Sequence, residues 1–246
     1  MANTTKRFLG SEPKGRINSF QSLGAVDGPG LRCVVFMQGC PLRCIYCHNP
    51  ETWDCAGGEE MTVAELFDKI NKYERYIKAN GGVTISGGEP LMQARFVTSL
   101  LKKLQENGYH TALDTSGTGE SEEAEALLRY CDLVICDLKF TDRERYKTYC
   151  GGDAEKVFAF LRLTEKMQKD LWVRQVIVPG INDSTEQAEK LRKIAYGYSN
   201  LRKIELLPFR KICETKYASM GMEFKLRDTE ECTPEKRAAL QRIVEG

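Results

Sequence analysis

The chain has 246 residues, enough for one barrel-sized domain or two small ones, which excludes a mini-protein and a long multidomain assembly. Hydrophobic residues make up 41% of it and charged residues 29%, a composition typical of a globular protein rather than a disordered one. Its 36 Lys and Arg nearly balance its 35 Asp and Glu, so we expect no nucleic-acid partner, and its apolar runs are far shorter than the roughly 20 residues of a membrane span.

Residues 1–14 are polar and show no hydrophobic period, so we predict a flexible N-terminal tail there and a single domain over residues 15–246. Only Phe8 and Leu9 are apolar behind the first basic residues, whereas a secretory signal needs about 7–15 apolar residues. We therefore expect a cytoplasmic protein. In that compartment its ten cysteines would be metal ligands or buried thiols rather than disulfides.

Six short apolar runs rich in β-forming residues follow one another along the chain. They cover residues 31–37, 83–85, 110–113, 133–138, 171–178 and 203–207. Several are almost continuously apolar, which is typical of parallel strands covered on both faces.

Helical patterns with recognisable caps alternate with these runs. They begin at the capping box Thr62–Glu65, at Gln93, at a second capping box Ser184–Gln187 and at Thr233-Pro234, and the first is predicted to run on to Gly81. The alternation predicts right-handed βαβ units and a parallel sheet. Six strands are too few for a closed eight-stranded barrel, so the pattern leaves two α/β candidates: a partial, open-sided barrel and a doubly wound sheet.

Cys40, Cys44 and Cys47 form a C-x3-C-x2-C cluster directly after the first apolar run. A structural zinc site needs four ligands, commonly in two separated pairs, and here only His48 is at hand as a fourth. An iron–sulfur cube bound by three thiolates instead keeps one iron open for chemistry. We favour the cube and keep a zinc site on the three cysteines and His48 as the alternative.

The other seven cysteines show no second cluster. Cys33 and Cys136 lie in apolar runs and Cys131 precedes one, so we expect them in the core. The remaining four are scattered along the chain: Cys55, Cys150, Cys213 and Cys232.

Polar residues gather where the predicted strands end. Besides the cysteine cluster they are Ser86-Gly87-Gly88-Glu89, Asp114-Thr115-Ser116 and Asp137-Leu138-Lys139. In parallel barrels these ends carry the functional groups. Gly87 and Gly88 allow a close backbone approach to a ligand, and Glu89 could accept a hydrogen bond from an amino group. Asp114 and Asp137 each need a cationic or hydrogen-bonding partner if buried.

The cysteine motif, with an aromatic residue before its last cysteine, resembles the radical S-adenosylmethionine (SAM) superfamily. Further blocks resemble the glycyl-radical-activating branch of that superfamily, namely the pyruvate formate-lyase activating enzymes. They are GRINSF at 15–20, VDGPG at 26–30, QGC at 38–40, YCHN at 46–49, SGGEP at 86–90, LDTSG at 113–117, DLK at 137–139, VPG at 178–180 and KIELLP at 203–208. These blocks run in order over most of the chain.

The resemblance implies a partial (β/α)6 TIM-like barrel, open on one side, with a [4Fe-4S] cluster on Cys40, Cys44 and Cys47. It implies an oxidoreductase in which reduced flavodoxin or ferredoxin supplies an electron and SAM is cleaved to a 5′-deoxyadenosyl radical. This radical would take a hydrogen atom from a glycine of pyruvate formate-lyase. We expect a monomer.

The resemblance also implies which residues contact SAM. They are Tyr46, His48, Ser86, Gly87, Gly88, Glu89, Asp114, Thr115, Asp137, Leu138 and Lys139. Asp114, Thr115 and Asp137 would also place a monovalent cation near the SAM carboxylate, and Lys139 could pair with SAM or with Asp137. Asp27, in the constrained turn at 26–30, would lie near the docked glycine loop.

Two sequence features bear on the branch. Where the family has a His near the adenosine, this chain has Arg210, and between Cys47 and Gly87 it has only Cys55. Activating enzymes of several other glycyl radical enzymes carry an eight-cysteine segment there, so its absence favours the pyruvate formate-lyase branch. Activation of another glycyl radical enzyme, such as anaerobic ribonucleotide reductase, and a small-molecule radical SAM enzyme remain alternatives.

Overall fold

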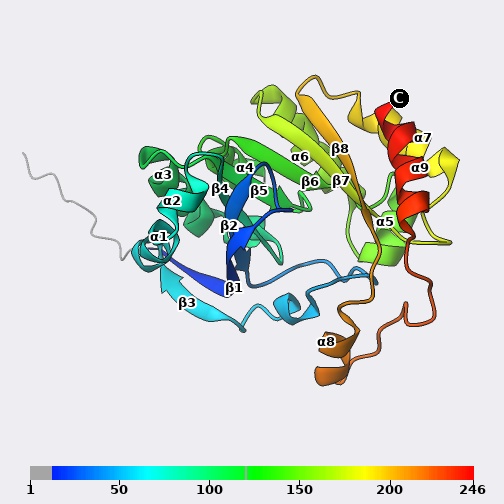
Figure 1. Cartoon of the computed structure of the whole chain (residues 1–246), viewed down its shortest axis with the longest axis horizontal. Coiled ribbons are helices and arrows are strands. Elements are labelled where there is room, and N and C mark those ends of the chain that lie inside the picture. Colours follow the sequence, from blue (N-terminus) through cyan, green and yellow to red (C-terminus); the bar gives the residue numbers. More distant parts are fainter. Residues whose placement is uncertain (1–12, 120) are drawn as a thin grey trace, which may run out of the picture.

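The structure, a computed structural model, describes residues 13–119 and 121–246 (Figure 1). The first twelve residues of the expected tail lie outside this range. Strand β1 (Lys14–Gly24) begins at the last residue of that expected tail.

Within these ranges the chain builds one eight-stranded sheet with the order β3-β1-β2-β4-β5-β6-β7-β8. Six neighbouring strands run parallel: β2 (Leu31–Met37), β4 (Gly81–Gly87), β5 (Thr111–Thr115), β6 (Leu133–Asp137), β7 (Asp170–Ile177) and β8 (Leu201–Pro208). These are the six predicted runs. At one edge β1 pairs antiparallel with β2, and β3 (Glu59–Thr62) pairs antiparallel with β1.

The strand order decides between the two candidate folds. A doubly wound sheet reverses its strand order at a switch point, whereas here the parallel strands follow one another in chain order without reversal. In the described part of the chain β3 and β8 are the two edges and do not pair, so the barrel stays open. The prediction of a partial, open-sided (β/α)6 barrel is confirmed.

Helices occupy most connections between the parallel strands, and two more follow the last strand. They are α1 (Val63–Asn71), α2 (Glu74–Ile77), α3 (Ala94–Glu106), α4 (Ser121–Leu128), α5 (Arg143–Cys150), α6 (Ala154–Lys166), α7 (Thr185–Ala195), α8 (Glu214–Ser219) and α9 (Pro234–Glu245), with 3-10 turns η1 (Pro50–Trp53) and η2 (Pro90–Gln93). Figure 1 shows α1, α2 and α3 at one end of the sheet and α7 and α9 beside β8 at the other. None of the helices in the described ranges has the length and apolar character needed to cross a bilayer.

The predicted caps position these helices. The Thr62 hydroxyl accepts from Glu65 N and the Glu65 carboxylate accepts from Thr62 N, a complete capping box before α1. The Ser184 hydroxyl accepts from Gln187 N, but the Gln187 amide contacts Thr141 instead of returning to the cap, so only half of the second box forms. The first helix does not run on to Gly81 as predicted, because it divides into α1 and α2.

Candidate functional site

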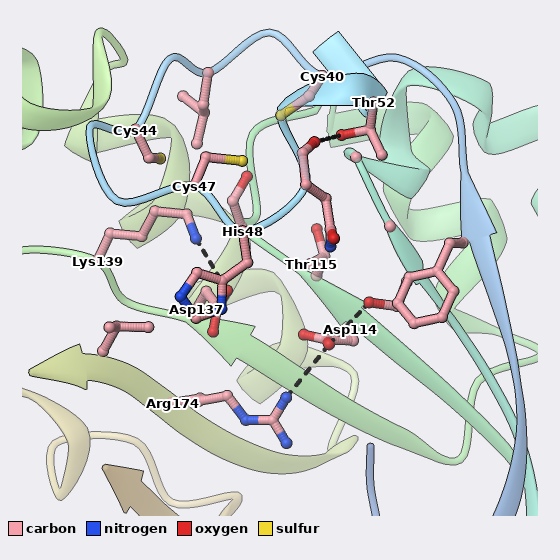
Figure 2. Close-up of a pocket in the computed structure, with 18 of the residues that line it drawn as sticks. Cys40, Cys44, Cys47, His48, Thr52, Asp114, Thr115, Asp137, Lys139 and Arg174 are labelled. Carbon is pink, nitrogen blue, oxygen red and sulfur yellow. Dashed lines mark hydrogen bonds and ion pairs between the residues drawn. The ribbon is translucent and has the colours of Figure 1, made fainter. Parts of the chain in front are cut away.

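A cavity of about 280 Å3 lies at the carboxyl ends of the parallel strands (Figure 2). The loop after β2 covers it, and the ends of β4, β5 and β6 form its floor. Of the residues predicted for the site, those that line it are Asp27, Cys40, Cys44, Tyr46, Cys47, His48, Ser86, Gly87, Gly88, Asp114, Thr115, Asp137 and Lys139. One cavity therefore brings together predicted residues that are up to 112 positions apart in the sequence, from Asp27 to Lys139.

Backbone hydrogen bonds hold the cysteine loop in place. Gly39 N donates to Thr52 O at 2.8 Å, which anchors the loop to η1, and Gly39 has a φ of +93° that favours glycine. On the other side Arg43 N donates to Cys150 O at 2.8 Å, so the end of α5 supports the loop. The three thiols thus project from a fixed backbone, and Figure 2 shows them on the side of the cavity formed by the loop after β2.

Burial disfavours the thiolate form of all three cysteines. It raises the pKa of Cys40 to about 12 and that of Cys47 to about 11. A hydrogen bond with Cys150, together with burial, raises the pKa of Cys44. Buried thiols of this kind become thiolates when a bound cation supplies the compensating charge, which is what an iron–sulfur cluster does.

The donor geometry fits a cluster better than one zinc ion. Among the residues that the structure describes, no group of three or more His, Cys, Asp and Glu side chains converges closely enough to hold a single metal ion. A cube is wider, because each thiolate binds a different iron. His48, the fourth ligand of the zinc alternative, donates from its Nε2 to Arg210 O at 2.8 Å, so that nitrogen is already engaged.

The end of β4 is locked to the cysteine loop through glycines. Gly88 N donates to Met37 O at 2.9 Å and Glu89 N donates to Gly39 O at 2.8 Å. A Cβ on Gly88 would lie 2.2 Å from Gly39 O, and Gly87 has a φ of +110°. Only glycines allow the two segments to approach this closely.

The Glu89 carboxylate is not among the side chains that line the cavity. It is fully buried and accepts hydrogen bonds from Thr115 Oγ1 at 2.6 Å, Ser116 N at 2.9 Å and Leu91 N at 3.0 Å. It thereby ties the turn after β4 to the turn after β5. Leu138 is also buried outside the cavity lining, and its carbonyl accepts from Gln175 Nε2.

A buried ion pair forms part of the floor. Arg174 Nη1 lies 3.3 Å from Asp114 Oδ2, and its Nη2 lies 2.8 Å from Glu205 Oε2. Ser86 Oγ donates to the same Asp114 oxygen at 3.0 Å. Burial raises the pKa of Asp114 to about 6, even though Arg174 opposes this shift. Figure 2 shows the Arg174 guanidinium directed at Asp114.

Lys139 and Asp137 form the second ion pair of the site. Lys139 Nζ lies 2.9 Å from Asp137 Oδ2, so the lysine pairs with the aspartate within the chain. Burial alone would lower the pKa of Lys139, but Asp137 and the nearby thiols raise it well above its usual value. Asp137 Oδ1 is buried and has no hydrogen-bond partner among the described residues, which leaves one acceptor for a bound group.

The turn that carries Asp27 is tied to the barrel wall. Arg174 Nη2 donates to Val26 O at 3.1 Å, and Thr84 Oγ1 donates to Asp27 O at 2.6 Å. Burial raises the pKa of the Asp27 carboxyl, while Arg174 and Arg32 oppose the shift. The turn therefore presents a partly buried carboxyl to the cavity.

Some residues of the site were not predicted. Arg174 lines the cavity, as do the apolar side chains of Trp53, Val176 and Leu207, whereas Ser116, which also lines it, belongs to the strand ends named from the sequence. Arg174 had a signal in the sequence, since it is the one charged residue in the apolar run 171–178. Arg210, the departure from the family, pairs with Glu231 at 3.0 Å and does not line the cavity.

Comparisons with known proteins agree with this geometry. Residues 26–154 match a family described as a 4Fe-4S single cluster domain. The pyruvate formate-lyase-activating enzyme of Clostridium pasteurianum is 44% identical over 231 residues, which cover 94% of this chain and 97% of that protein. The enzyme of the same name from Staphylococcus aureus (strain USA300) is 39% identical over 239 residues, covering 94% and 95%.

Two solved structures show the same fold. A domain of a pyruvate-formate lyase-activating enzyme from Bacteroides vulgatus superposes with a TM-score of 0.55 at 23% identity, covering 67% of this chain and 93% of that one. A radical SAM methyltransferase from Sphaerobacter thermophilus superposes with a TM-score of 0.64 at 15% identity, covering 87% and 63%.

Proposed function

Since the chain belongs to the pyruvate formate-lyase activating enzymes of the radical SAM superfamily, we propose that it activates pyruvate formate-lyase by generating a glycyl radical on that enzyme. A [4Fe-4S] cluster and SAM are its cofactors. When bound and reduced, the cluster would supply the one electron that cleaves SAM to methionine and a 5′-deoxyadenosyl radical. This radical would take a hydrogen atom from the α-carbon of a partner glycine. The observation that carries this proposal is the meeting of three thiols, one buried and two partly buried, with the predicted strand-end residues in one cavity.

Cys40, Cys44 and Cys47 would hold the cluster. Their burial and their positions on one loop, which backbone hydrogen bonds fix, support this assignment. A cube with three protein thiolates would have one iron without a protein ligand, and the three cysteines line the same cavity as the residues predicted to contact SAM. The SAM amino and carboxylate groups would bind there.

SAM would lie along the strand ends. The Gly87-Gly88 backbone, Ser86 and Thr115 offer close polar contacts, and Asp137 Oδ1 offers a buried acceptor to the amino group. Tyr46 and His48 would border the ligand, and Lys139 would act on it through Asp137. Asp114, Thr115 and Asp137 lie on one side of the cavity, which supports a monovalent cation near the SAM carboxylate. Glu89 acts indirectly, by fixing the turn that carries Gly88.

The remaining lining residues would protect and orient the reaction. Trp53, Val176 and Leu207 are apolar and reduce the water around the reacting carbon. The unpaired edges β3 and β8 leave one side of the barrel open, and the partner's glycine loop would enter there. Asp27 would face that loop. Holding the glycine within contact distance supplies the positional part of the rate enhancement.

We further propose a monomer of one domain over residues 15–246, working in the cytoplasm with reduced flavodoxin or ferredoxin as electron donor. All ten cysteines are free thiols, as expected in a reducing compartment. The exposed large hydrophobic residues of the described ranges come from different parts of the chain: Leu23, Val26, Tyr76, Met92, Tyr196, Ile212 and Met220. A single sheet joins residues 14–208 into one unit.

Substitution of one thiol tests the assignment. Cys44→Ala removes a loop ligand and little core volume, so we expect a folded protein that forms no 5′-deoxyadenosine when reconstituted with iron and sulfide and reduced with dithionite in the presence of SAM. Cys131→Ala is the matched control, because this buried thiol precedes β6 at the opposite end of the sheet and should keep SAM cleavage. Retention of SAM cleavage by Cys44→Ala would refute the assignment, as would a colourless, air-stable wild type that binds zinc.

A further inference from the structure

The turn at residues 26–30, called the Asp27 turn below, is held by its carbonyl oxygens. Arg32 Nη1 donates to Pro29 O at 3.1 Å, and Thr84 Oγ1 donates to Asp27 O at 2.6 Å. Arg32 Nε donates in turn to the same threonine oxygen at 2.6 Å. One guanidinium on β2 therefore fixes the turn at two points, directly at Pro29 and through Thr84 at Asp27.

Arg32 is an unusual residue to find in the core. Its side chain is fully buried and forms no ion pair with a carboxylate of the described residues. Its Nη2 donates to Val83 O at 2.8 Å and lies 3.3 Å from His110 Nδ1. Burying a charge without an opposite charge is costly, so packing alone does not account for an arginine at this position. Its hydrogen bonds to the Asp27 turn supply a reason.

The same arrangement leaves the side chains of the turn available to a partner. Asp27 lines the cavity, and its carboxylate accepts no hydrogen bond from any residue that the structure describes. The neighbouring Val26 side chain is 75% exposed, while its carbonyl is bound by Arg174 Nη2. The turn thus presents one acceptor and one apolar contact at the cavity, and its backbone carbonyls are engaged within the chain.

We propose that Arg32 is a positioning residue for the partner, which fixes the Asp27 turn in the conformation that receives the glycine segment of pyruvate formate-lyase. The inference rests on the proposed function. Gly28 and Gly30 have φ angles of +125° and +72°, and glycines adopt many backbone conformations, so the turn needs outside contacts to keep one of them.

Loss of these contacts should weaken partner binding and spare the chemistry. A turn that is no longer fixed must be ordered when the lyase binds, and this ordering reduces affinity. Neither Arg32 nor Thr84 lines the cavity that holds the cysteines and the residues predicted to contact SAM. The effect should therefore appear in the KM for the lyase and not in SAM cleavage without the lyase.

Two rates of the cluster-loaded protein test the proposal. One is formation of 5′-deoxyadenosine from SAM with dithionite and no lyase, and the other is glycyl radical formation at increasing lyase concentration, followed by electron paramagnetic resonance (EPR). Arg32→Met and Thr84→Val should each raise the KM for the lyase roughly three- to tenfold and leave the first rate within about twofold of wild type. The double variant should raise the KM by less than the product of the two single effects, because both side chains act through one chain of hydrogen bonds.

Thr111→Val is the matched control. Thr111 is as buried as Thr84, but its hydroxyl hydrogen-bonds to Tyr130 O and to the Asp132 carboxylate instead of the turn. Its replacement should lower stability and leave the KM for the lyase unchanged. If Arg32→Met does not fold, Thr84→Val and this control give the same comparison.

The outcomes separate this inference from the function on which it rests. An unchanged KM in the folded variants, an equal rise with Thr111→Val, or independent effects in the double variant would overturn the inference and leave the proposed function intact. A parallel loss of SAM cleavage would show a general structural role and would also overturn it. A wild type that cleaves SAM but forms no radical on the lyase would instead contradict the proposed function.

Discussion

Arg174 Nη1 lies 3.3 Å from Asp114 Oδ2 beneath the cavity, and their side chains are only 6% and 12% exposed. The same guanidinium pairs with Glu205 on β8 and donates to Val26 O in the turn before β2. One side chain on β7 therefore connects β5, β8 and the turn that presents Asp27.

Removal of this cation should destabilise the protein strongly. We expect Arg174→Met to lower the free energy of unfolding of the cluster-free protein by about 3–5 kcal/mol, because the buried Asp114 carboxylate would lose its cation, whereas Glu205 would keep its pair with Lys203. The control is Arg202→Met, which removes an Arg202–Asp170 pair of 2.8 Å that also joins β7 and β8 but is more than half exposed. It should cost less than about 1 kcal/mol. If urea unfolding showed the same loss of unfolding free energy for Arg174→Met and Arg202→Met, the role assigned to Arg174 would be contradicted.

The Asp114 carboxyl should make stability depend on pH. Its pKa is about 6 in the folded protein against 3.8 ordinarily, so between these values the folded chain holds a proton that the unfolded chain has lost. Stability should therefore fall as pH rises from about 4 to 6, by an amount on the order of 3 kcal/mol, and show no further change from this group above that range. Urea unfolding of the cluster-free wild type and of Asp114→Asn at several pH values measures the difference. Parallel curves for the two proteins would show that Asp114 does not titrate in this window.

The turn before β2 should tolerate no side chain at Gly30. Gly30 and Gly180 have nearly equal φ angles of +72° and +75°, but a Cβ on Gly30 would lie 1.5 Å from Asn80 O, whereas one on Gly180 would meet nothing within 4 Å. Gly180→Ala should cost about 1–2 kcal/mol from its backbone conformation alone. Gly30→Ala should cost about 1–3 kcal/mol more and displace the turn that carries Asp27. Thermal unfolding of both variants measures the difference between their losses of stability. Similar losses for Gly30→Ala and Gly180→Ala would exclude the clash with Asn80 O.

Glu89 should not accept an amide in place of its carboxylate. Its Oε1 accepts from Leu91 N and its Oε2 accepts from Ser116 N, so a glutamine must direct its NH2 group at one of two backbone N–H groups. We expect Glu89→Gln to cost about 1–3 kcal/mol in urea unfolding and to weaken SAM binding indirectly. Glu65→Gln is the control, because a glutamine also serves in a capping box and should change little. If Glu89→Gln left the unfolding free energy unchanged, the Glu89 carboxylate would not be what joins the turn after β4 to the turn after β5.

Much of the fold was predictable because its signals are local. The parallel strands β2 and β4 to β7 are mostly buried on both faces and read as apolar runs, and β8 reads as one although it is an edge strand with few buried residues. Thr62 and Thr233 mark helix starts through their own hydroxyls. Strands β1 and β3 escaped prediction because they form the antiparallel edge, where β1 alternates buried and exposed residues and β3 has no fully buried residue. Their assignment depends on pairing partners rather than on composition.

The residues of the site also fall into a predictable and an unpredictable group. Residues at strand ends fell into one cavity because parallel strands bring their carboxyl ends together. The side-chain direction of Glu89 was not predictable, since it depends on donors at 115 and 116 that only the folded chain brings close. Cys150 looked like a scattered cysteine, because the hydrogen bond from Arg43 N to its carbonyl spans 107 residues and depends on where α5 ends.

The central claim is tested most directly by EPR of the partner. Anaerobic incubation of this protein with SAM, a reductant and pyruvate formate-lyase should give a doublet signal on the lyase, because a glycyl radical keeps one α-hydrogen. Lyase labelled with α-deuterated glycine should narrow the doublet and transfer deuterium to 5′-deoxyadenosine, and the Cys44→Ala protein should give neither signal nor transfer. Formation of 5′-deoxyadenosine without a radical on the lyase, or a radical on anaerobic ribonucleotide reductase instead, would contradict the proposed function.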